Sequence, residues 1–373
     1  MHILHISKYA YPERGGIETF VRDLTVQQKR QGHTVALLCH RATSLSATKV
    51  QQTGGVSITR SGILCNFPFA PFSLQFPLQL NKQLKKQRPD VIHLHMPNIA
   101  ILFFSIIPTD IPLVVHWHAD VQGSPHALIH ATYPLYRYFE KKTLSRAARI
   151  IATSPPYMES SPSLLHWKEK CEIVPLGLDQ GRYPASPMCS RSDHPLIISV
   201  GRFSFYKGFE YLVRAAALTP EAELVIAGDG PTRSRISAEV ERLNLSARVS
   251  LPGNVTDEEL RILLQRADIF CLPSVNRGEA FGVAIIEAMH YGLPLVTTAI
   301  PGSGTGWVNQ DGVTGRVVRP ESPKELAVVI KEIINDPHIK TAFGKAARQR
   351  LDTNFTIAKV GRSIEHIYNQ ITD

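Results

Sequence analysis

The sequence lacks the features of a membrane-spanning or disulfide-bonded protein. It has no run of about 18 apolar residues, so no membrane-spanning helix is expected. Its five cysteines are odd in number and scattered, and none forms a C-x-x-C pair, which favours reduced thiols. The apolar start over residues 1–7 is too short for a signal peptide and predicts a first strand instead. These absences indicate a cytoplasmic protein.

Signatures of bound cofactors are absent as well. The sequence has no Asp-x-Asp pair, and no G-x-G-x-x-G follows the first predicted strand, so neither a metal nor NAD is expected. Four histidines suggest zinc, namely His93, His95, His116 and His118. They lie at alternate positions of two predicted strands, however, and no cysteine accompanies them. We therefore expect no metal and no other cofactor such as PLP.

The positive charge is unevenly distributed. The formal net charge is +9 at pH 7, and the excess lies in the first half, at residues 82–88 and 137–149. Both segments predict helices with basic faces. No nucleic-acid-binding motif accompanies them, so no nucleic-acid partner is expected. A basic face of this kind either contacts anionic lipid headgroups or is simply solvated.

Strands and helices alternate along the whole chain. Short apolar runs, typical of parallel strands buried on both faces, predict strands over residues 2–7, 34–39, 91–95, 113–118, 149–153, 172–176, 196–200, 222–227, 248–251, 269–272, 295–297 and 315–318. Helices are predicted between them, among others over residues 17–31, 78–87, 135–145, 209–218 and 283–291. Two successive β-α-β arrays predict an α/β protein with two doubly wound domains. A chain of 373 residues also exceeds the usual size of one core.

A polar stretch broken by prolines, residues 176–195, separates the two arrays. It predicts an N-terminal domain over residues 1–180 and a C-terminal domain over residues 181–355. The remaining segment, residues 356–373, predicts a final helix.

Two carboxylates in the second array carry the strongest functional signal. Glu279 precedes a predicted helix and Glu287 lies about two turns into it, which separates the carboxylates by roughly 10 Å. That spacing suits binding the two ends of one ligand. Between them the backbone N–H groups of Phe281, Gly282 and Val283 would lie at the helix N-terminus, an anion-binding position. Carboxylates for hydroxyls on both sides of an anion site fit a sugar nucleotide.

This pattern resembles the E-x7-E motif of retaining glycosyltransferases with the GT-B fold, family 4 (group 1), of the bacterial surface-polysaccharide type. Other segments match the family in order over nearly the whole chain. The resemblance implies two Rossmann-like domains facing across a cleft, with the acceptor bound mainly by the N-terminal domain. The C-terminal domain would bind the nucleotide sugar, and the final helix would cross back to the N-terminal domain. The implied reaction transfers a hexosyl group to an acceptor hydroxyl with retention of the anomeric configuration.

The resemblance also assigns donor-binding residues. Arg202 and Lys207, in a G-R-x-x-x-x-K-G element, would bind the diphosphate, and both would be catalytic, as would Glu279. Glu287 would hold the ribose hydroxyls and Glu279 the 3- and 4-hydroxyls of the sugar. Two basic residues on a solvated loop are the alternative to the diphosphate site. Further donor contacts are implied at Gly15, Gly16, Gly228, Gly230, Asn254, Val255, Phe281, Gly282 and Val283.

The acceptor side is assigned to the first array. His118 matches the histidine that contacts the transferred sugar near its 6-hydroxyl, which makes it a catalytic candidate. His116 is an alternative for this role, and Asp120 would orient the histidine or bind the acceptor. Gly16 completes the acceptor set, although paired glycines also suit a plain tight turn. A buried histidine satisfied within the core is the alternative for both His116 and His118.

The identity of the donor rests on a single further resemblance, and that of the acceptor on the basic first half and the bacterial style of the motifs. The glycine-rich segment 301–307 is similar to one in members that use GDP-mannose or GDP-deoxyhexose. A lipid-linked or polysaccharide acceptor in O-antigen, lipopolysaccharide or exopolysaccharide assembly is expected. Such an acceptor would suit a protein peripheral on the inner face of the cytoplasmic membrane. A UDP-sugar-dependent transferase, a sugar-nucleotide 2-epimerase and a non-catalytic sugar-nucleotide-binding protein remain alternatives.

Overall fold

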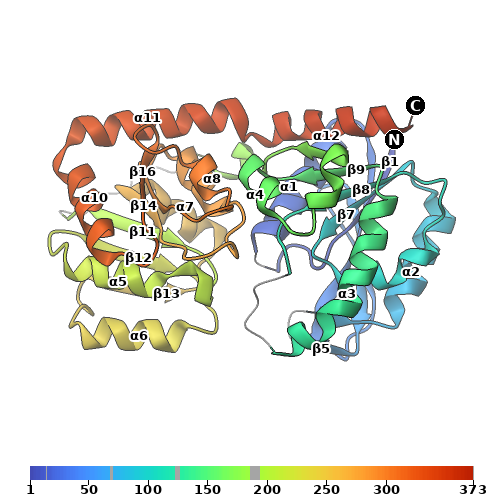
Figure 1. The fold of residues 1–373 in the computed structure, drawn as a ribbon, viewed down its shortest axis with the longest axis horizontal. Helices are drawn as coiled ribbons and strands as arrows, with labels where there is room; N and C mark the ends of the chain where they lie inside the picture. The colour runs from blue at the N-terminus through green and yellow to red at the C-terminus, as the bar shows by residue number, and fades with distance from the viewer. Residues whose placement is uncertain (14, 68–69, 122–126, 185–193, 373) are drawn as a thin grey trace. The chain divides into compact units, whose positions relative to one another are not determined.

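The computed structural model describes residues 1–13, 15–67, 70–121, 127–184 and 194–372 (Figure 1). The chain divides into two compact units. The N-terminal unit comprises Met1–Gly177 together with Ile357–Asp373, and the C-terminal unit comprises Leu178–Thr356. The divisions therefore fall after residues 177 and 356, against predicted boundaries after 180 and 355.

The N-terminal unit is built on an eight-stranded sheet of order β10-β9-β8-β7-β1-β2-β4-β3. Its neighbouring strands are parallel except for the β3–β4 pair. Because β1 lies between β2 and β7, the winding direction changes at β1, and the carboxyl end of β1 is a switch point. The strands are β1 (His2–Ile6), β2 (Thr34–Ser44), β3 (Lys49–Thr53), β4 (Val56–Ile63), β7 (Val91–Met96), β8 (Leu113–Trp117), β9 (Arg149–Ala152) and β10 (Cys171–Ile173).

Helices on this sheet include one from the far end of the sequence. They are α1 (Gly16–Arg30), α2 (Gln75–Gln87), α3 (Ala127–Arg146), α4 (Pro155–Ser160) and α12 (Ile357–Thr372), with 3₁₀ segments η1 (Ile99–Ile106) and η2 (Leu165–Lys170). Helix α12, red in Figure 1, buries Ile364 and Ile367 in the N-terminal unit. It also contacts α1, and the amide of Gln31, the residue after α1, donates a hydrogen bond of 2.8 Å to Glu365. Helix α3 begins earlier than the predicted start at 135 and contains Pro134.

Two strand pairs in the N-terminal unit were not predicted. Strands β3 and β4 form an antiparallel hairpin around Gly54 and Gly55, which both have positive φ angles. Paired glycines between two short runs are a known hairpin signal, so the sequence did contain the information. A second small pair, β5 (Cys65–Phe67) with β6 (Ala70–Phe72), forms a separate two-stranded sheet.

The C-terminal unit contains a six-stranded, fully parallel sheet of order β13-β12-β11-β14-β15-β16. Its strands are β11 (Leu196–Val200), β12 (Glu223–Ala227), β13 (Val249–Gly253), β14 (Ile269–Leu272), β15 (Leu295–Thr298) and β16 (Gly315–Val318). Its helices are α5 (Phe209–Ala217), α6 (Arg233–Arg242), α7 (Asp257–Arg266), α8 (Val283–His290), α9 (Thr305–Val308), α10 (Pro323–Asn335) and α11 (Pro337–Asn354), with 3₁₀ segments η3 (Gln180–Arg182) and η4 (Phe205–Lys207).

The core of the C-terminal unit lies between this sheet and its helices. Ile197 and Leu224 of the strands pack in one apolar cluster with Leu212 of α5 and Ile330 of α10. The predicted α/β class with two doubly wound arrays is confirmed. Within the described residues, no helix combines the length and the apolar character needed to cross a membrane.

Candidate functional site

The predicted donor-binding residues of the C-terminal unit lie beyond the carboxyl ends of parallel strands. Arg202 follows β11, Gly228 follows β12, and the exposed Asn254 follows β13 with the half-buried Val255. Glu279 lies on the loop between β14 and α8. Strand β11 has β12 on one side and β14 on the other, so these loops meet at the switch point of the sheet. Ligands of doubly wound sheets bind at such a point.

Glycines allow these loops to pack backbone against backbone. The Gly228 N–H donates a hydrogen bond of 2.8 Å to the carbonyl of Gly253. A Cβ atom on Gly228 would lie 2.0 Å from the carbonyl oxygen of Gly201, and one on Gly230 would lie 2.5 Å from that of Phe203. Both glycines are therefore needed for loop packing, and their contact with a donor stays a prediction.

A buried ion pair occupies the centre of the switch point. The ammonium of Lys207 lies 2.5 Å from Oε2 of Glu279, and both side chains are about nine-tenths buried. The Ser274 hydroxyl donates to the same oxygen at 3.1 Å. Burial is the largest single influence and would lower the pKa of Lys207. The charge and hydrogen bond of Glu279, with smaller contributions from Tyr206 and Glu287, together outweigh it, so this pKa lies above its ordinary value. The structure thus brings two of the predicted catalytic residues together as a charged pair.

The glycine-rich segment after β15 holds the Glu279 loop in place. The Ser303 hydroxyl donates to the carbonyl of Glu279, and the Gly304 N–H donates to the carbonyl of Ala280 at 2.8 Å. The Thr298 hydroxyl donates to the carbonyl of Ser274. The sequence marked this segment only by its similarity to one in family members that use GDP-sugars, and its anchoring of Glu279 was missed.

Several hydrogen-bond donors close in sequence to Lys207 and Glu279 have no acceptor in the part of the chain that the structure describes. Arg202 is exposed, and its guanidinium has no partner among the residues that the structure describes. Over the same described ranges, the N–H groups of Phe281 and Gly282, just before α8, have no acceptor. Gly282 has φ +85°, which favours glycine at this helix start. The side chain of Phe281 is buried against Phe355, so its backbone rather than its ring is available to a ligand.

Glu287 lies on α8 and is held by a tyrosine that the sequence did not single out. The Tyr183 hydroxyl donates a hydrogen bond of 2.8 Å to Oε1 of Glu287. Tyr183 is buried, and the guanidinium of Arg182 lies 4.9 Å from the centre of its ring. His290 donates from Nε2 to the Tyr183 carbonyl at 2.9 Å. Tyr183 lies within the polar boundary stretch, where no periodicity marks a buried aromatic residue.

In the N-terminal unit, the loop after β1 carries Gly15 and Gly16. Helix α1 begins at Gly16. A Cβ atom on Gly15 would lie 2.2 Å from Oε2 of Glu18, so the Glu18 carboxylate folds back over the start of the helix. A carboxylate is favourable there because it faces the positive end of the helix dipole. The position predicted to contact the donor therefore already has a carboxylate of the protein close by.

His116 and His118 belong to a larger array of buried histidines on one face of the N-terminal sheet. The array spans the adjacent strands β1, β7 and β8, with His5 opposite His93 and His95 opposite His116. Burial lowers the pKa of His5 to about 4 and that of His118 to about 3. Burial also holds the other three pKa values well below 6.5. All five rings are therefore neutral at pH 7.

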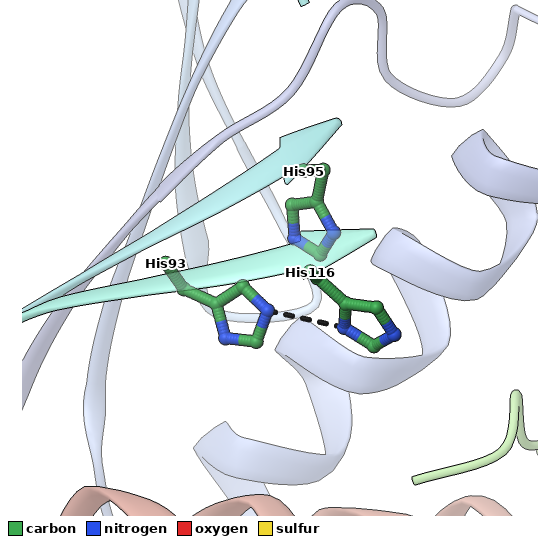
Figure 2. A group of neighbouring side chains, drawn as sticks. All are labelled: His93, His95 and His116. Carbon is green, nitrogen blue, oxygen red and sulfur yellow. Dashed lines mark hydrogen bonds between the residues drawn. The ribbon is translucent and has the colours of Figure 1, made fainter. Parts of the chain in front are cut away.

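Figure 2 shows His93 and His95 beside His116, with a hydrogen bond between the first and the last. That bond joins His93 Nε2 to His116 Nδ1 at 3.2 Å. These three histidines can each offer a ring nitrogen, and the three nitrogens lie within 4.8 Å of one another. The rings of His93 and His95 stack at 4.6 Å, a parallel arrangement that does not direct their lone pairs to one point. The expectation of no metal therefore stays a prediction.

Two family models match the chain, one over the first half of the sequence and one over the second. Residues 14–182 match the family model Glycosyltransferase Family 4, and residues 189–350 match Glycosyl transferases group 1. The chain belongs to this glycosyltransferase family. The E-x7-E glutamates of the glycosyltransferase, Glu279 and Glu287, both lie within the second match.

Named relatives cover the glycosyltransferase nearly from end to end. O-antigen chain mannosyltransferase C of Escherichia coli is 29% identical over 388 residues, covering 100% of this chain and 99% of the relative. D-rhamnosyltransferase WbpZ of Pseudomonas aeruginosa is 29% identical over 368 residues, covering 95% and 92%.

Solved structures support the same fold. Sucrose-phosphate synthase from Thermosynechococcus elongatus has a TM-score of 0.81 at 23% identity, covering 99% of this chain and 98% of that one. HepE of Anabaena, in complex with UDP and glucose, has a TM-score of 0.77 at 20% identity, covering 99% of both chains. The glycosyltransferase therefore has the GT-B architecture of two Rossmann-like units.

Asp120 of the glycosyltransferase is tied into the N-terminal unit. Its Oδ1 accepts hydrogen bonds from Trp117 Nε1 at 3.0 Å and from the Ser161 hydroxyl at 2.6 Å. Its backbone N–H donates to the Tyr157 hydroxyl at 2.7 Å. These contacts fix the chain directly after His118. They give Asp120 a structural role, and its contact with an acceptor stays a prediction.

Proposed function

We propose that this glycosyltransferase moves a hexosyl group from a nucleoside-diphosphate sugar to a hydroxyl of a lipid-linked or polysaccharide acceptor. The names of its relatives, an O-antigen mannosyltransferase and a D-rhamnosyltransferase, favour bacterial surface glycan assembly and a mannosyl or deoxyhexosyl donor. We further propose a GDP-sugar as donor, retention of the anomeric configuration and independence of metal. The observation that carries the proposal is the buried Lys207–Glu279 pair, close in sequence to donors that have no acceptor within the described ranges of the chain.

The proposed chemistry uses the charges at the switch point of the C-terminal unit. When the sugar leaves, negative charge grows on the diphosphate. Arg202, Lys207 and the N–H groups before α8 are donors that would stabilise this charge, as fixed cations can do where other enzymes use a metal. Glu279 and Glu287 would bind hydroxyls of the sugar and the ribose. In this arrangement the positively charged and N–H groups bind the anionic diphosphate, and the two carboxylates bind the neutral hydroxyls.

The acceptor would be bound mainly by the N-terminal unit. His116 lies near the end of β8 and His118 directly follows that strand, at the carboxyl edge of the sheet. Doubly wound units bind ligands at this edge. Gly16, the first residue of α1, and Asp120, on the loop after β8, lie at the same edge. These residues remain the proposed acceptor contacts, with His118 the candidate for the transferred sugar itself.

A thermal-shift panel of GDP, UDP, ADP and dTDP, with and without Mg²⁺, tests this proposal. A ligand at about 100 times its Kd adds about 2.7 kcal/mol to the free energy of unfolding. We expect GDP to raise the melting temperature without Mg²⁺, and we expect Glu287→Ala to abolish the effect. Stabilisation by UDP alone would favour a UDP-sugar donor. A response to NAD or glycan but to no nucleoside diphosphate would contradict the proposal.

Turnover assays separate the enzymatic alternatives. Incubation with UDP-N-acetylhexosamine and no acceptor would yield an epimer if the protein were a 2-epimerase. Nucleotide binding without transfer to any glycan acceptor would favour the non-catalytic alternative. We expect transfer from the GDP-sugar, with no epimer formed.

We also propose that α2 of the N-terminal unit contacts an anionic membrane surface. Leu74 and Leu78 are 61% and 68% exposed, and the exposed Lys82, Lys85 and Lys86 follow along the helix. Residues four apart share a helix face, so the two leucines and Lys82 form one stripe. Apolar residues beside lysines on one face favour binding at the headgroup level of a bilayer.

Neutralising two of these lysines should weaken membrane binding. Each lysine near an anionic surface contributes about 1 kcal/mol, so Lys85→Gln with Lys86→Gln should lower partitioning into anionic vesicles roughly 30-fold. Vesicle sedimentation measures this, and donor hydrolysis should be unchanged. The matched control, Lys324→Gln with Lys345→Gln, removes the same charge from exposed positions of the C-terminal unit. Full sedimentation of the α2 variant would contradict a role of α2 at the membrane.

A further inference from the structure

The five buried histidines form two hydrogen-bonded chains that both begin at Gln28 of α1. In the first chain, Gln28 Oε1 lies 2.7 Å from His5 Nε2, and His5 Nδ1 lies 3.0 Å from His95 Nε2. His95 Nδ1 then lies 2.9 Å from His118 Nε2. The first chain therefore connects a helix side chain to the end of β8 through three imidazoles.

The second chain begins at the other end of the same amide. Gln28 Nε2 donates to the Tyr368 hydroxyl of α12 at 3.1 Å, and that hydroxyl is bonded to His93 Nδ1. His93 Nε2 lies 3.2 Å from His116 Nδ1. This chain reaches the end of β8 through one tyrosine and two imidazoles, on a path parallel to the first.

The amide of Gln28 sets the direction of every bond in the first chain. A neutral imidazole has one N–H donor and one acceptor nitrogen. Because Gln28 Oε1 can only accept, His5 carries its proton on Nε2 and accepts at Nδ1. Since His5 Nδ1 accepts, His95 must donate from Nε2 and accept at Nδ1. His118 must then donate from Nε2 in turn, so all three rings carry their proton on Nε2. The first chain thus ends at His118 Nδ1 with a lone pair, and this buried atom has no partner among the described residues.

The second chain ends with the opposite polarity. The Tyr368 oxygen accepts from the Gln28 amide, so its single O–H proton is donated to His93 Nδ1. His93 must then carry its proton on Nε2 and donate it to His116 Nδ1. The remaining proton of His116 lies on Nε2, a buried atom that also lacks a partner within the described part of the chain. The second chain therefore ends with a donor.

The two chain ends lie side by side. The rings of His116 and His118 stack with centres 4.3 Å apart and planes 9° apart. Phe20 of α1 covers both rings edge-on, at 5.1 and 5.7 Å. An unpaired buried donor or acceptor costs about 1–3 kcal/mol. A hydroxyl group can donate to the lone pair of His118 Nδ1 and accept from the N–H of His116, so it satisfies one unpaired acceptor and one unpaired donor.

We propose that Gln28 and Tyr368 are positioning residues that fix the tautomers of all five histidines, so that His118 Nδ1 accepts from, and His116 Nε2 donates to, hydroxyl groups of the bound sugar. The identity of the ligand rests on the function proposed above, whereas the tautomers do not. Turning the Gln28 amide by 180° would reverse every bond in both chains, so this one amide decides which histidine donates. Specificity for hydroxyls at the acceptor edge is thereby set by two side chains, Gln28 and Tyr368, that act through the histidines.

Long-range ¹H–¹⁵N correlation spectra of the full chain, labelled with ¹⁵N-histidine and free of ligand, test the proposal at pH 7.5. We expect each of the five rings as one tautomer with its proton on Nε2. Tyr368→Phe should produce mixed tautomers at His93 and His116 only, because it cuts the second chain alone. Gln28→Met should produce mixed tautomers at all five. The control Gln27→Met, one position along α1, should leave them unchanged.

Several outcomes would overturn the proposal. Mixed tautomers in the unsubstituted protein, or protons on Nδ1, would show that Gln28 does not impose this direction. Equal disturbance of His5, His95 and His118 by Tyr368→Phe would show that the two chains are not separate. If Gln28→Met fails to fold, Tyr368→Phe alone decides between these outcomes. Because the spectra need no ligand, failure of the donor assay does not affect this test.

Discussion

Replacing Lys207 with methionine is expected to lower kcat/KM for sugar transfer by about 100-fold or more. Removal of one preorganised donor from a developing oxyanion typically costs a factor of about 10² to 10³ in rate. Lys207 is such a donor in the proposed reaction, and its raised pKa keeps it charged throughout the neutral range. Steady-state kinetics with the GDP-sugar measure this loss directly.

The same substitution should also destabilise the C-terminal unit. Without Lys207, the buried Glu279 carboxylate keeps only the Ser274 hydroxyl as a side-chain partner among the described residues. Breaking a buried pair typically costs about 3–5 kcal/mol. The double variant Lys207→Met with Glu279→Gln removes both charges, so it should regain stability while remaining inactive. Urea denaturation and kinetics on the same samples separate the two effects.

A second ion pair of the C-terminal unit supplies the control. Arg214 and Glu239 lie 2.6 Å apart, but Arg214 is 41% exposed, and exposed pairs contribute only about 0–1 kcal/mol. Arg214→Gln should therefore change neither activity nor stability much. If Lys207→Met retained more than about a tenth of the activity, the lysine would be structural and the diphosphate site would lie elsewhere.

The local pattern of the sequence was sufficient to predict most strands and the helix that carries Glu287. Apolar runs mark strands such as β11 and β14 because both of their faces are buried. The pairing of Lys207 with Glu279 was not predictable in this way, since the two residues are 72 positions apart. Only the order of strands in the sheet brings their loops together, and that order is a property of the whole unit.

The histidine array illustrates the same limit. Spacing alone predicted that His116 and His118 share a face, as do His93 and His95. It did not reveal that His5 and His93 are opposite one another in register, or that Gln28 and Tyr368 join the array from two helices. Tyr368 lies near the end of the chain, so no local signal connects it to β7. Tertiary packing, rather than periodicity, determines which polar groups are satisfied.

Acidification should unfold this protein at a pH where its carboxylates are still largely ionised. An unfolded histidine titrates near 6.5, whereas the pKa of His5 is about 4 and that of His118 about 3 in the folded protein. Below pH 6.5 the unfolded chain therefore binds protons that the folded protein excludes. The stabilising effect of neutral rings is complete above pH 6.5 and is lost progressively as the pH falls toward the folded pKa values.

The expected slope is steep because many rings act together. Each histidine contributes about 1.4 kcal/mol per pH unit, so the five-ring array contributes up to about 7 kcal/mol per pH unit. His40, with a pKa of about 4, adds to this slope, and Glu140, whose pKa burial raises to about 7, offsets a similar amount. Typical domains have about 5–15 kcal/mol of stability, which places the transition between about pH 6 and 4.5.

Urea denaturation at pH 7.5, 6.5 and 5.5, followed by circular dichroism, measures the slope. His5→Asn should reduce it by about 1.4 kcal/mol per pH unit, because one buried imidazole no longer titrates on unfolding. His2→Asn removes an exposed histidine from the same strand and should leave the slope unchanged. A fall in the free energy of unfolding of less than about 1.5 kcal/mol between pH 6.5 and 5.5 would contradict this prediction. It would mean that the folded array accepts protons. Neutral rings with fixed tautomers could not then be its resting state.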